Sequence, residues 1–116
     1  MQYLCLVYPG ADFTPRQADV PSYLSVRDAM TKAGVYVGSG ALQPAESATT
    51  IHRRGGDIVL TDGPFAEMAE HVGGYFVLDC ADLDEAVKWA VTIPAMARDA
   101  SVEIRPLIEF TVPPEA

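Results

Sequence analysis

The segment from Tyr3 to Tyr8 has an apolar or aromatic side chain at every position. Successive side chains of a β-strand point to opposite faces of the sheet. A strand that is apolar at both odd and even positions therefore needs cover on both of its faces. If helices cover only one face, the simplest cover for the other is a second copy of the chain.

Two segments have the signals of helices. Pro21 suits the first position of a helix and Gly34 suits its end, so a helix is predicted over residues 21–33. A second helix begins after Asp82, its predicted N-cap, with Glu85 placed as in a capping box, and Pro94 closes it. The predicted buried stripes consist of Tyr23, Val26, Met30 and Ala33 in the first helix, and of Leu83, Ala86, Val87, Ala90 and Val91 in the second.

Strand patterns occupy residues 3–8, 35–37, 49–53, 57–61, 74–79 and 101–110. The third and fourth of these form a hairpin whose turn holds Gly55 and Gly56. The order is then strand, helix, strand, hairpin, strand, helix, strand. This order predicts an α+β fold, a ferredoxin-like split βαβ sandwich with an inserted β-hairpin. Because both helices of that plan cover one face of the sheet, the bare face predicts a homodimer.

The composition predicts one folded domain over residues 1–116, since 49% of the residues are hydrophobic and 21% are charged. The formal net charge of −8 argues against direct binding to DNA or RNA, since 8 Lys+Arg stand against 16 Asp+Glu. The start of the chain has no signal-peptide pattern, and no apolar run is long enough to span a membrane, so the predicted location is the cytoplasm. Cys5 and Cys80 lack metal-ligand spacing and are predicted to be buried free thiols.

The stretch from Thr61 to Glu67, with the sequence TDGPFAE, carries the strongest candidate site. One interpretation is structural: Asp62 or Gly63 caps a short helical turn that Pro64 opens, and Phe65 anchors the turn in the core. The other is that Asp62, Phe65 and Glu67 border a pocket and orient a polar ligand. The two interpretations are compatible with each other.

A catalytic role for this stretch would need a base. Helix-terminal N–H groups would hold the pKa of Asp62 low, so Asp62 suits the orientation of a histidine better than proton abstraction. His71 is the histidine nearest in sequence, and an Asp62–His71 pair is the candidate dyad. Arg53 is a candidate carboxylate binder, and Gly40 a point where backbone approaches a ligand. No zinc spacing or serine-nucleophile motif occurs, and no cofactor is predicted.

Several stretches resemble the YCII-related proteins of the DGPF type. They are YLCLVY near the start, GSGALQPAESATTI and VLTDGPFAE in the middle, then GGYFVLDCADLDEAVKWAVTIP and SVEIRPLIEF. The resemblance spans nearly the full length and implies a dimeric α+β barrel, in which two ferredoxin-like sheets face each other. It also implies a proposed His–Asp pair in some relatives. The predicted first helix has no histidine, so that pair does not transfer to this chain. Separately, Met68-Ala69 replace the usual Thr-Lys, which removes a cation that would neutralise the acidic residues nearby.

Two functional hypotheses follow. The first is a small dimeric protein that binds a small polar organic ligand near the DGPF turn, with or without an enzymatic reaction of lyase or isomerase type. The second is a non-catalytic accessory or interaction protein associated with sigma-factor-linked transcription, which the resemblance implies for some relatives.

Overall fold

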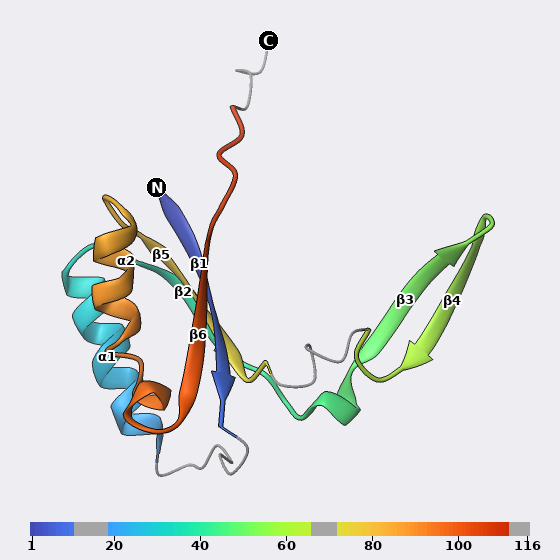
Figure 1. Cartoon of the computed structure of the whole chain (residues 1–116), viewed down its shortest axis with the longest axis horizontal. Helices are drawn as coiled ribbons and strands as arrows, with labels where there is room; N and C mark the ends of the chain where they lie inside the picture. Colours follow the sequence, from blue (N-terminus) through green and yellow to red (C-terminus); the bar gives the residue numbers. More distant parts are fainter. Residues whose placement is uncertain (11–18, 66–71, 112–116) are drawn as a thin grey trace.

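A computed structural model describes residues 1–10, 19–65 and 72–111 of the chain. Figure 1 shows these residues as a body, made of a sheet and helices, and a β-hairpin that projects from it. We call this hairpin the arm. The body determines the fold class, and the arm carries part of the predicted site.

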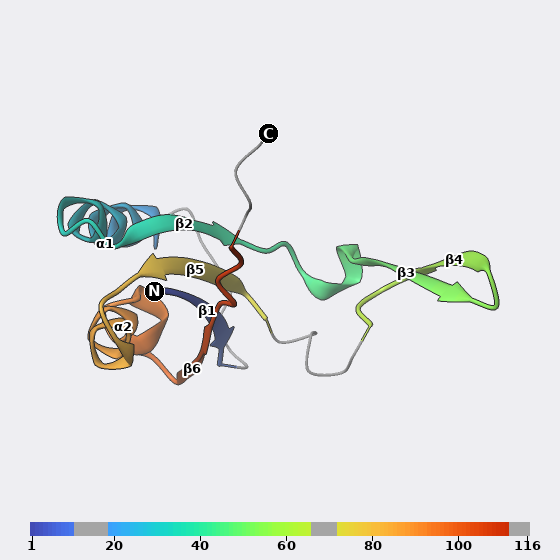
Figure 2. The same ribbon diagram turned by 90° about the horizontal axis from the view of Figure 1, so that it is seen from above.

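The body contains a four-stranded antiparallel sheet with the order β2-β5-β1-β6. The strands are β1 (Gln2–Pro9), β2 (Tyr36–Ala41), β5 (Gly74–Asp79) and β6 (Ala100–Pro106). Helices α1 (Val20–Lys32) and α2 (Leu83–Ala90) lie on the same side of the sheet (Figures 1 and 2). This arrangement confirms the predicted ferredoxin-like α+β fold.

The core lies between the sheet and the helices. Tyr3, Cys5 and Val7 point toward the helices and are buried, whereas the even positions of β1 point the other way and are partly exposed. Met30, Leu78 and Ile93 are among the most completely buried side chains of this core. We call the other side of the sheet the open face; its central side chains are Leu4, Leu6, Tyr8, Tyr75 and Val77.

Helix α2 begins directly after its predicted cap, and α1 begins at Val20, one residue before the predicted start. Pro21 lies in the first turn of α1, and Gly34 follows its end with a φ of 77°, a conformation that favours glycine. Asp82 caps α2 by accepting a hydrogen bond of 2.9 Å from the Glu85 N–H. The Glu85 carboxylate accepts a bond of 2.9 Å from the N–H of Ala81, which is one residue before the donor of the standard capping box.

The predicted buried stripes are partly wrong. Ala33 at the end of α1 is exposed, as are Leu83, Val87 and Val91 along α2. Only Ala86 and Ala90 of α2 are buried. The small side chains of Ala86 and Ala90 allow the helix backbone to come close to the sheet, and Trp89 beside them also packs against the core, so the contact face is rotated away from the predicted aliphatic residues.

The last strand is shorter than predicted. It ends at Pro106, and the following N–H, that of Leu107, donates a bond of 2.9 Å to the carbonyl of Gln2, where β1 begins. Beyond this point the neighbouring strand offers no further partner. Residues 107–111 therefore continue away from the sheet, and the predicted strand residue Ile108 is exposed.

The arm consists of β3 (Thr49–Arg54), the predicted turn at Gly55 and Gly56, and β4 (Asp57–Asp62). The φ angles of Gly55 and Gly56 are 56° and 91°, and positive values at both positions are what a two-residue hairpin turn requires. The predicted hairpin is thus confirmed. A feature absent from the prediction is its distance from the core, because the arm projects on the side opposite the helices (Figure 1).

Both cysteines are free and buried, as predicted. Burial raises the pKa of the Cys5 thiol to about 11, with a smaller contribution from Cys80, and burial likewise raises the pKa of Cys80 to about 11, aided by Glu85. At neutral pH both thiols are therefore protonated and unreactive. Among the described residues, no helix has the length and apolar character needed to cross a membrane.

Candidate functional site

Three strand ends and the first turns of α1 meet at one end of the sheet. The chains of β1 and β2 leave the sheet there, and β5 enters it. Two backbone hydrogen bonds join them: the Gly73 N–H donates to the Val7 carbonyl at 2.8 Å, and the Leu42 N–H donates to the Gly73 carbonyl at 2.9 Å. The backbone at this end is thus fixed from both sides of β5.

Glycines make this convergence possible. A Cβ atom on Gly73 would lie 2.5 Å from Cγ of Pro9, and one on Gly74 would lie 2.9 Å from the Gly40 carbonyl oxygen. At Gly40 a Cβ would lie 2.9 Å from the ring of Tyr75. Each glycine therefore allows an approach that a larger residue would block.

The converging segments surround a pocket of about 180 Å³, which we call the end pocket. Val7 and Phe76, whose side chains point to the helix side of the sheet, contribute apolar and aromatic surface, and the lining residues Ser39 and Tyr23 carry hydroxyl groups. The Ser39 hydroxyl lies 2.7 Å from the hydroxyl of Tyr36, which orients it. Such a lining, mostly apolar with a few fixed polar groups, is typical of a site for a small organic molecule.

Tyr23 supplies a protonated phenol at neutral pH. Burial raises its pKa above the ordinary value, the nearby Asp19 carboxylate raises it further, and Arg98 opposes this. No carboxylate, imidazole or thiol lines the end pocket within the described ranges. This part of the site can therefore bind and orient a ligand, but it has no general base of its own.

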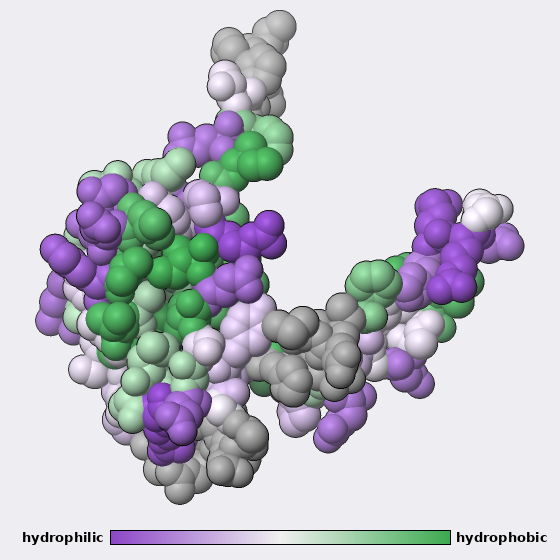
Figure 3. All heavy atoms as spheres, in the orientation of Figure 1, coloured by the Kyte–Doolittle hydropathy of each residue, from purple (hydrophilic) through white to green (hydrophobic). Residues whose placement is uncertain are grey.

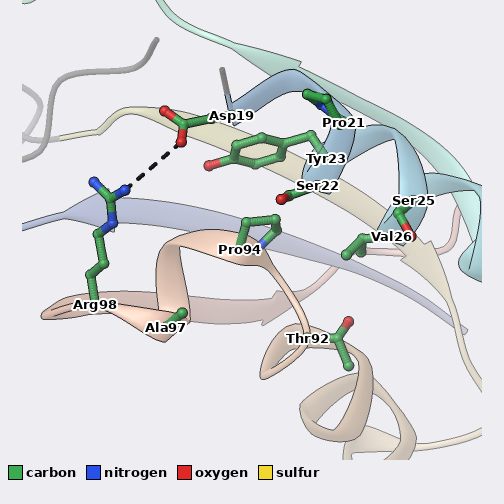
Figure 4. A pocket seen from close by; sticks show the side chains of 10 residues that line it. All are labelled: Asp19, Pro21, Ser22, Tyr23, Ser25, Val26, Thr92, Pro94, Ala97 and Arg98. Carbon is green, nitrogen blue, oxygen red and sulfur yellow. Dashed lines mark ion pairs between the residues drawn. The ribbon is translucent and has the colours of Figure 1, made fainter. Parts of the chain in front are cut away.

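A second, more open groove lies on the other side of Tyr23, between the start of α1 and the 3-10 helix η4 (Pro94–Ala97). Figure 4 shows the Tyr23 ring and the ion pair of Asp19 with Arg98, whose closest atoms are 3.8 Å apart. The groove measures about 600 Å³. Because it is wide and open, it encloses a small ligand less completely than the end pocket does.

The DGPF turn begins where β4 ends. The Gly63 N–H donates to the Ala48 carbonyl at 2.7 Å, and the Thr50 hydroxyl donates to the Gly63 carbonyl at 2.7 Å. Gly63 has a φ of 101°, which a larger residue would adopt only with strain. Phe65 is 75% exposed and its ring contacts His52 with a centroid distance of 5.2 Å, so it does not anchor the turn in the core.

The structure brings two of the predicted ligand residues onto one face of the arm. Asp62 is paired with Thr49 at the base, and Arg53 is paired with Ile58 near the tip. The two charged residues are separated by four positions along the hairpin, about 13 Å. No described side chain forms a hydrogen bond or ion pair with Asp62, and Asp62 does not line the end pocket.

Gly40 lies apart from these residues, in the wall of the end pocket. The remaining predicted residues, Glu67 and His71, lie outside the described ranges. The Asp62–His71 dyad and the Glu67 contribution therefore stay predictions.

Comparison with known proteins agrees with the fold. The family model described as "YCII-related domain" matches residues 1–111. The chain belongs to this family. It is also 32% identical over 114 residues to a protein of Rhizobium meliloti (strain 1021) named "Uncharacterized protein R00369", and the match covers 92% of each chain.

Three residues of the end pocket in this YCII-related chain, Tyr23, Ser39 and Tyr75, were not among the predicted site residues. The apolar or small residues beside them in the sequence indicate only that they lie in the core or in a strand. One signal was available, since Gly73 and Gly74 stand immediately before Tyr75 and Gly40 is the residue paired with it. Glycines in strand positions often accompany a close approach of backbone or ligand.

Proposed function

We propose that this YCII-related protein binds a small organic molecule in the end pocket. The observation that carries the proposal is the partly enclosed, mostly apolar pocket between three strand ends and α1, whose lining includes the hydroxyl-bearing residues Tyr23 and Ser39. The ligand class that fits is a molecule with a compact apolar body and one hydrogen-bonding group. The negative charge of the chain favours a neutral ligand over an anion.

We further propose that the protein acts as a homodimer whose subunits meet at the open face. Leu4, Leu6 and Val77 form an apolar centre on that face, and neither helix covers it. A second copy would remove this surface from water. The free, buried thiols support work in a reducing compartment, the predicted cytoplasm.

Catalysis of lyase or isomerase type would require a base in addition to the end-pocket residues described above. His71 is the predicted base, with Asp62 as the residue that orients it. Binding of a ligand does not depend on this dyad, so the binding proposal can be tested separately from any reaction.

The test uses four small probes: phenol, benzyl alcohol, cyclohexanol and benzoate. Each is titrated into isotopically labelled protein, and the amide resonances of Gly40, Gly74 and Tyr75 are followed. We expect the neutral probes to shift these resonances and to raise the melting temperature, because a ligand that binds only the folded state stabilises it. Benzoate should bind more weakly.

A matched pair of variants completes the test. Ala41→Phe places a ring where Ala41 lines the pocket, and it should abolish the shifts. Ala33→Phe makes the same change at the exposed end of α1 and should leave them intact. If no probe shifts the pocket resonances, or if Ala41→Phe binds as well as the unaltered chain, the proposal is overturned.

The alternative, a non-catalytic interaction protein, is favoured by one observation. Leu83, Val87 and Val91 leave an exposed aliphatic stripe on α2, which Figure 3 displays as part of an apolar area on that side of the body. Such a stripe suits a protein partner. The sigma-factor association that the resemblance implied stays a prediction.

A further inference from the structure

One face of the arm is apolar and uncovered. The register of the hairpin puts Ile51 beside Leu60, and Ile58 next along β4, on the same face. Their side chains are 65%, 66% and 50% exposed, respectively, whereas Ile93 in the core is 1% exposed. The opposite face holds His52 and Val59, and His52 contacts Phe65 there.

An arm of this kind is not expected to be stable alone. A two-stranded hairpin without a third strand or a packed helix is at best marginally stable in water. The strands of the arm make extensive contacts only with each other, and Figure 3 shows open space between the outer part of the arm and the body. The arm therefore needs a surface that the single chain does not provide.

The dimensions of the chain agree with this conclusion. The Cα radius of gyration is 16.7 Å, whereas a compact domain of this length has a radius of about 13 Å. A second projecting segment has the same character, because Ile108 and Phe110 beyond β6 are 77% and 81% exposed. Both segments leave the body with their large apolar side chains unpacked.

The position of the arm favours a second copy of this chain as the occupant. The arm lies on the side of the sheet opposite the helices, which is the side of the open face (Figures 1 and 2). A copy seated on the open face would therefore come within reach of the arm. In a two-fold dimer the contact is reciprocal, so each arm would reach the other subunit.

The charges of the arm face agree with such a reciprocal contact. Arg53 lies near the tip and Asp62 at the base of the same face. Where the two arms face each other across a two-fold axis that runs perpendicular to their strands, the second arm is reversed, so the tip of one arm comes next to the base of the other. Opposite charges then approach each other between subunits, although within one chain they are too far apart to pair.

We propose that each arm packs on the second copy of the chain and thereby buries Ile51, Ile58 and Leu60. The same contact places Asp62 at the interface between the subunits. The proposal rests on the homodimer of the proposed function. It gives Asp62 and Arg53 a place in a site that one copy does not form alone. It is independent of which ligand the end pocket takes.

The first experiment compares two variants by sedimentation over a range of protein concentrations. The double variant Ile51→Thr/Leu60→Thr keeps strand-favouring residues but removes aliphatic surface from the apolar face of the arm. Val59→Thr makes the same kind of change on the opposite face. We expect the dimer dissociation constant to rise at least about tenfold in the double variant and to change little in the control. Equal dissociation constants for both variants and the unaltered chain would overturn the proposal.

The second experiment uses mixed dimers. One population carries a spin label at Arg54→Cys, near the arm tip, and no isotope; the other carries the isotope and no label. The native cysteines are buried, so the label attaches at position 54. We expect amide resonances of the isotope-labelled copy to broaden, because the spin label broadens only resonances near it and the arm tip of one copy should lie beside the other copy.

The outcomes separate the two proposals. A dimer in which the mixed sample shows no broadening overturns the arm contact and leaves the open-face dimer standing. A chain that stays single at all concentrations overturns both the dimer and the arm contact, while the probe titrations still report on the end pocket by themselves.

Discussion

At the scale of the residue, the glycines of this chain have distinct roles that the sequence alone does not separate. Gly38 and Gly73 both occur in glycine-rich stretches near strand ends. A Cβ atom at Gly38 would meet nothing within 4 Å, whereas one at Gly73 would overlap the ring of Pro9. Neither has a positive φ, so the difference is one of space.

We expect Gly73→Ala to destabilise the protein by about 1–3 kcal/mol, the range for overpacking a well-packed site. Gly38→Ala should change the free energy of unfolding by less than about 0.5 kcal/mol. Urea denaturation of both variants measures these values. A larger loss of unfolding free energy in Gly38→Ala than in Gly73→Ala would contradict the close packing described around Gly73.

At the scale of the element, the sequence of α2 predicts where the helix begins but not which of its residues contact the core. Its cap follows from Asp82 and Glu85, whose side chains each accept one backbone hydrogen bond at 2.9 Å. Its contact face is not the predicted one, because Ala86, Trp89 and Ala90 pack against the core while Val87 and Val91 stay exposed. The same holds for the arm. Its turn is determined by neighbouring residues, whereas its position relative to the body is not.

Asp82→Ala should lower the free energy of unfolding by about 1 kcal/mol, because the Glu85 N–H loses its acceptor. Asp84→Ala is the control, since this residue lies in the first turn of α2 but does not cap it. There the loss of a favourable charge at the helix start is offset by the better helix propensity of alanine. Chemical denaturation, with the helical signal as readout, distinguishes the two; equal losses would argue against the cap.

At the scale of the whole molecule, the described chain is a body with two uncovered apolar regions and an extended arm. The open face has Leu6 at its centre, beside Tyr75 of β5 and Glu103 of β6. The outer stripe of α2 has Val87 at its centre. A second copy could bind at either region, and substitutions in the two regions distinguish these alternatives.

Leu6→Lys should convert the dimer to single chains, because a lysine at the centre of the open face would be buried without a partner in the dimer. Val87→Lys, on the outer side of α2, should leave the dimer intact. Sedimentation equilibrium at several concentrations measures both. A dimer that survives Leu6→Lys and is lost in Val87→Lys would assign the interface to α2 instead.

The sequence by itself determined the features that depend on neighbouring residues. The caps of α1 and α2, the Gly55-Gly56 turn and the period of β1 all follow from local backbone conformation and side-chain alternation, and the order of these elements was sufficient to predict the ferredoxin-like body. The tertiary structure decided which residues share a surface. It brought Gly40, Tyr75 and Tyr23 to one pocket, and it placed Asp62 and Arg53 on one face of the arm. It also ended β6 at Pro106. All three outcomes depend on strand pairing or on contacts between segments far apart in the chain, which neighbouring residues do not determine.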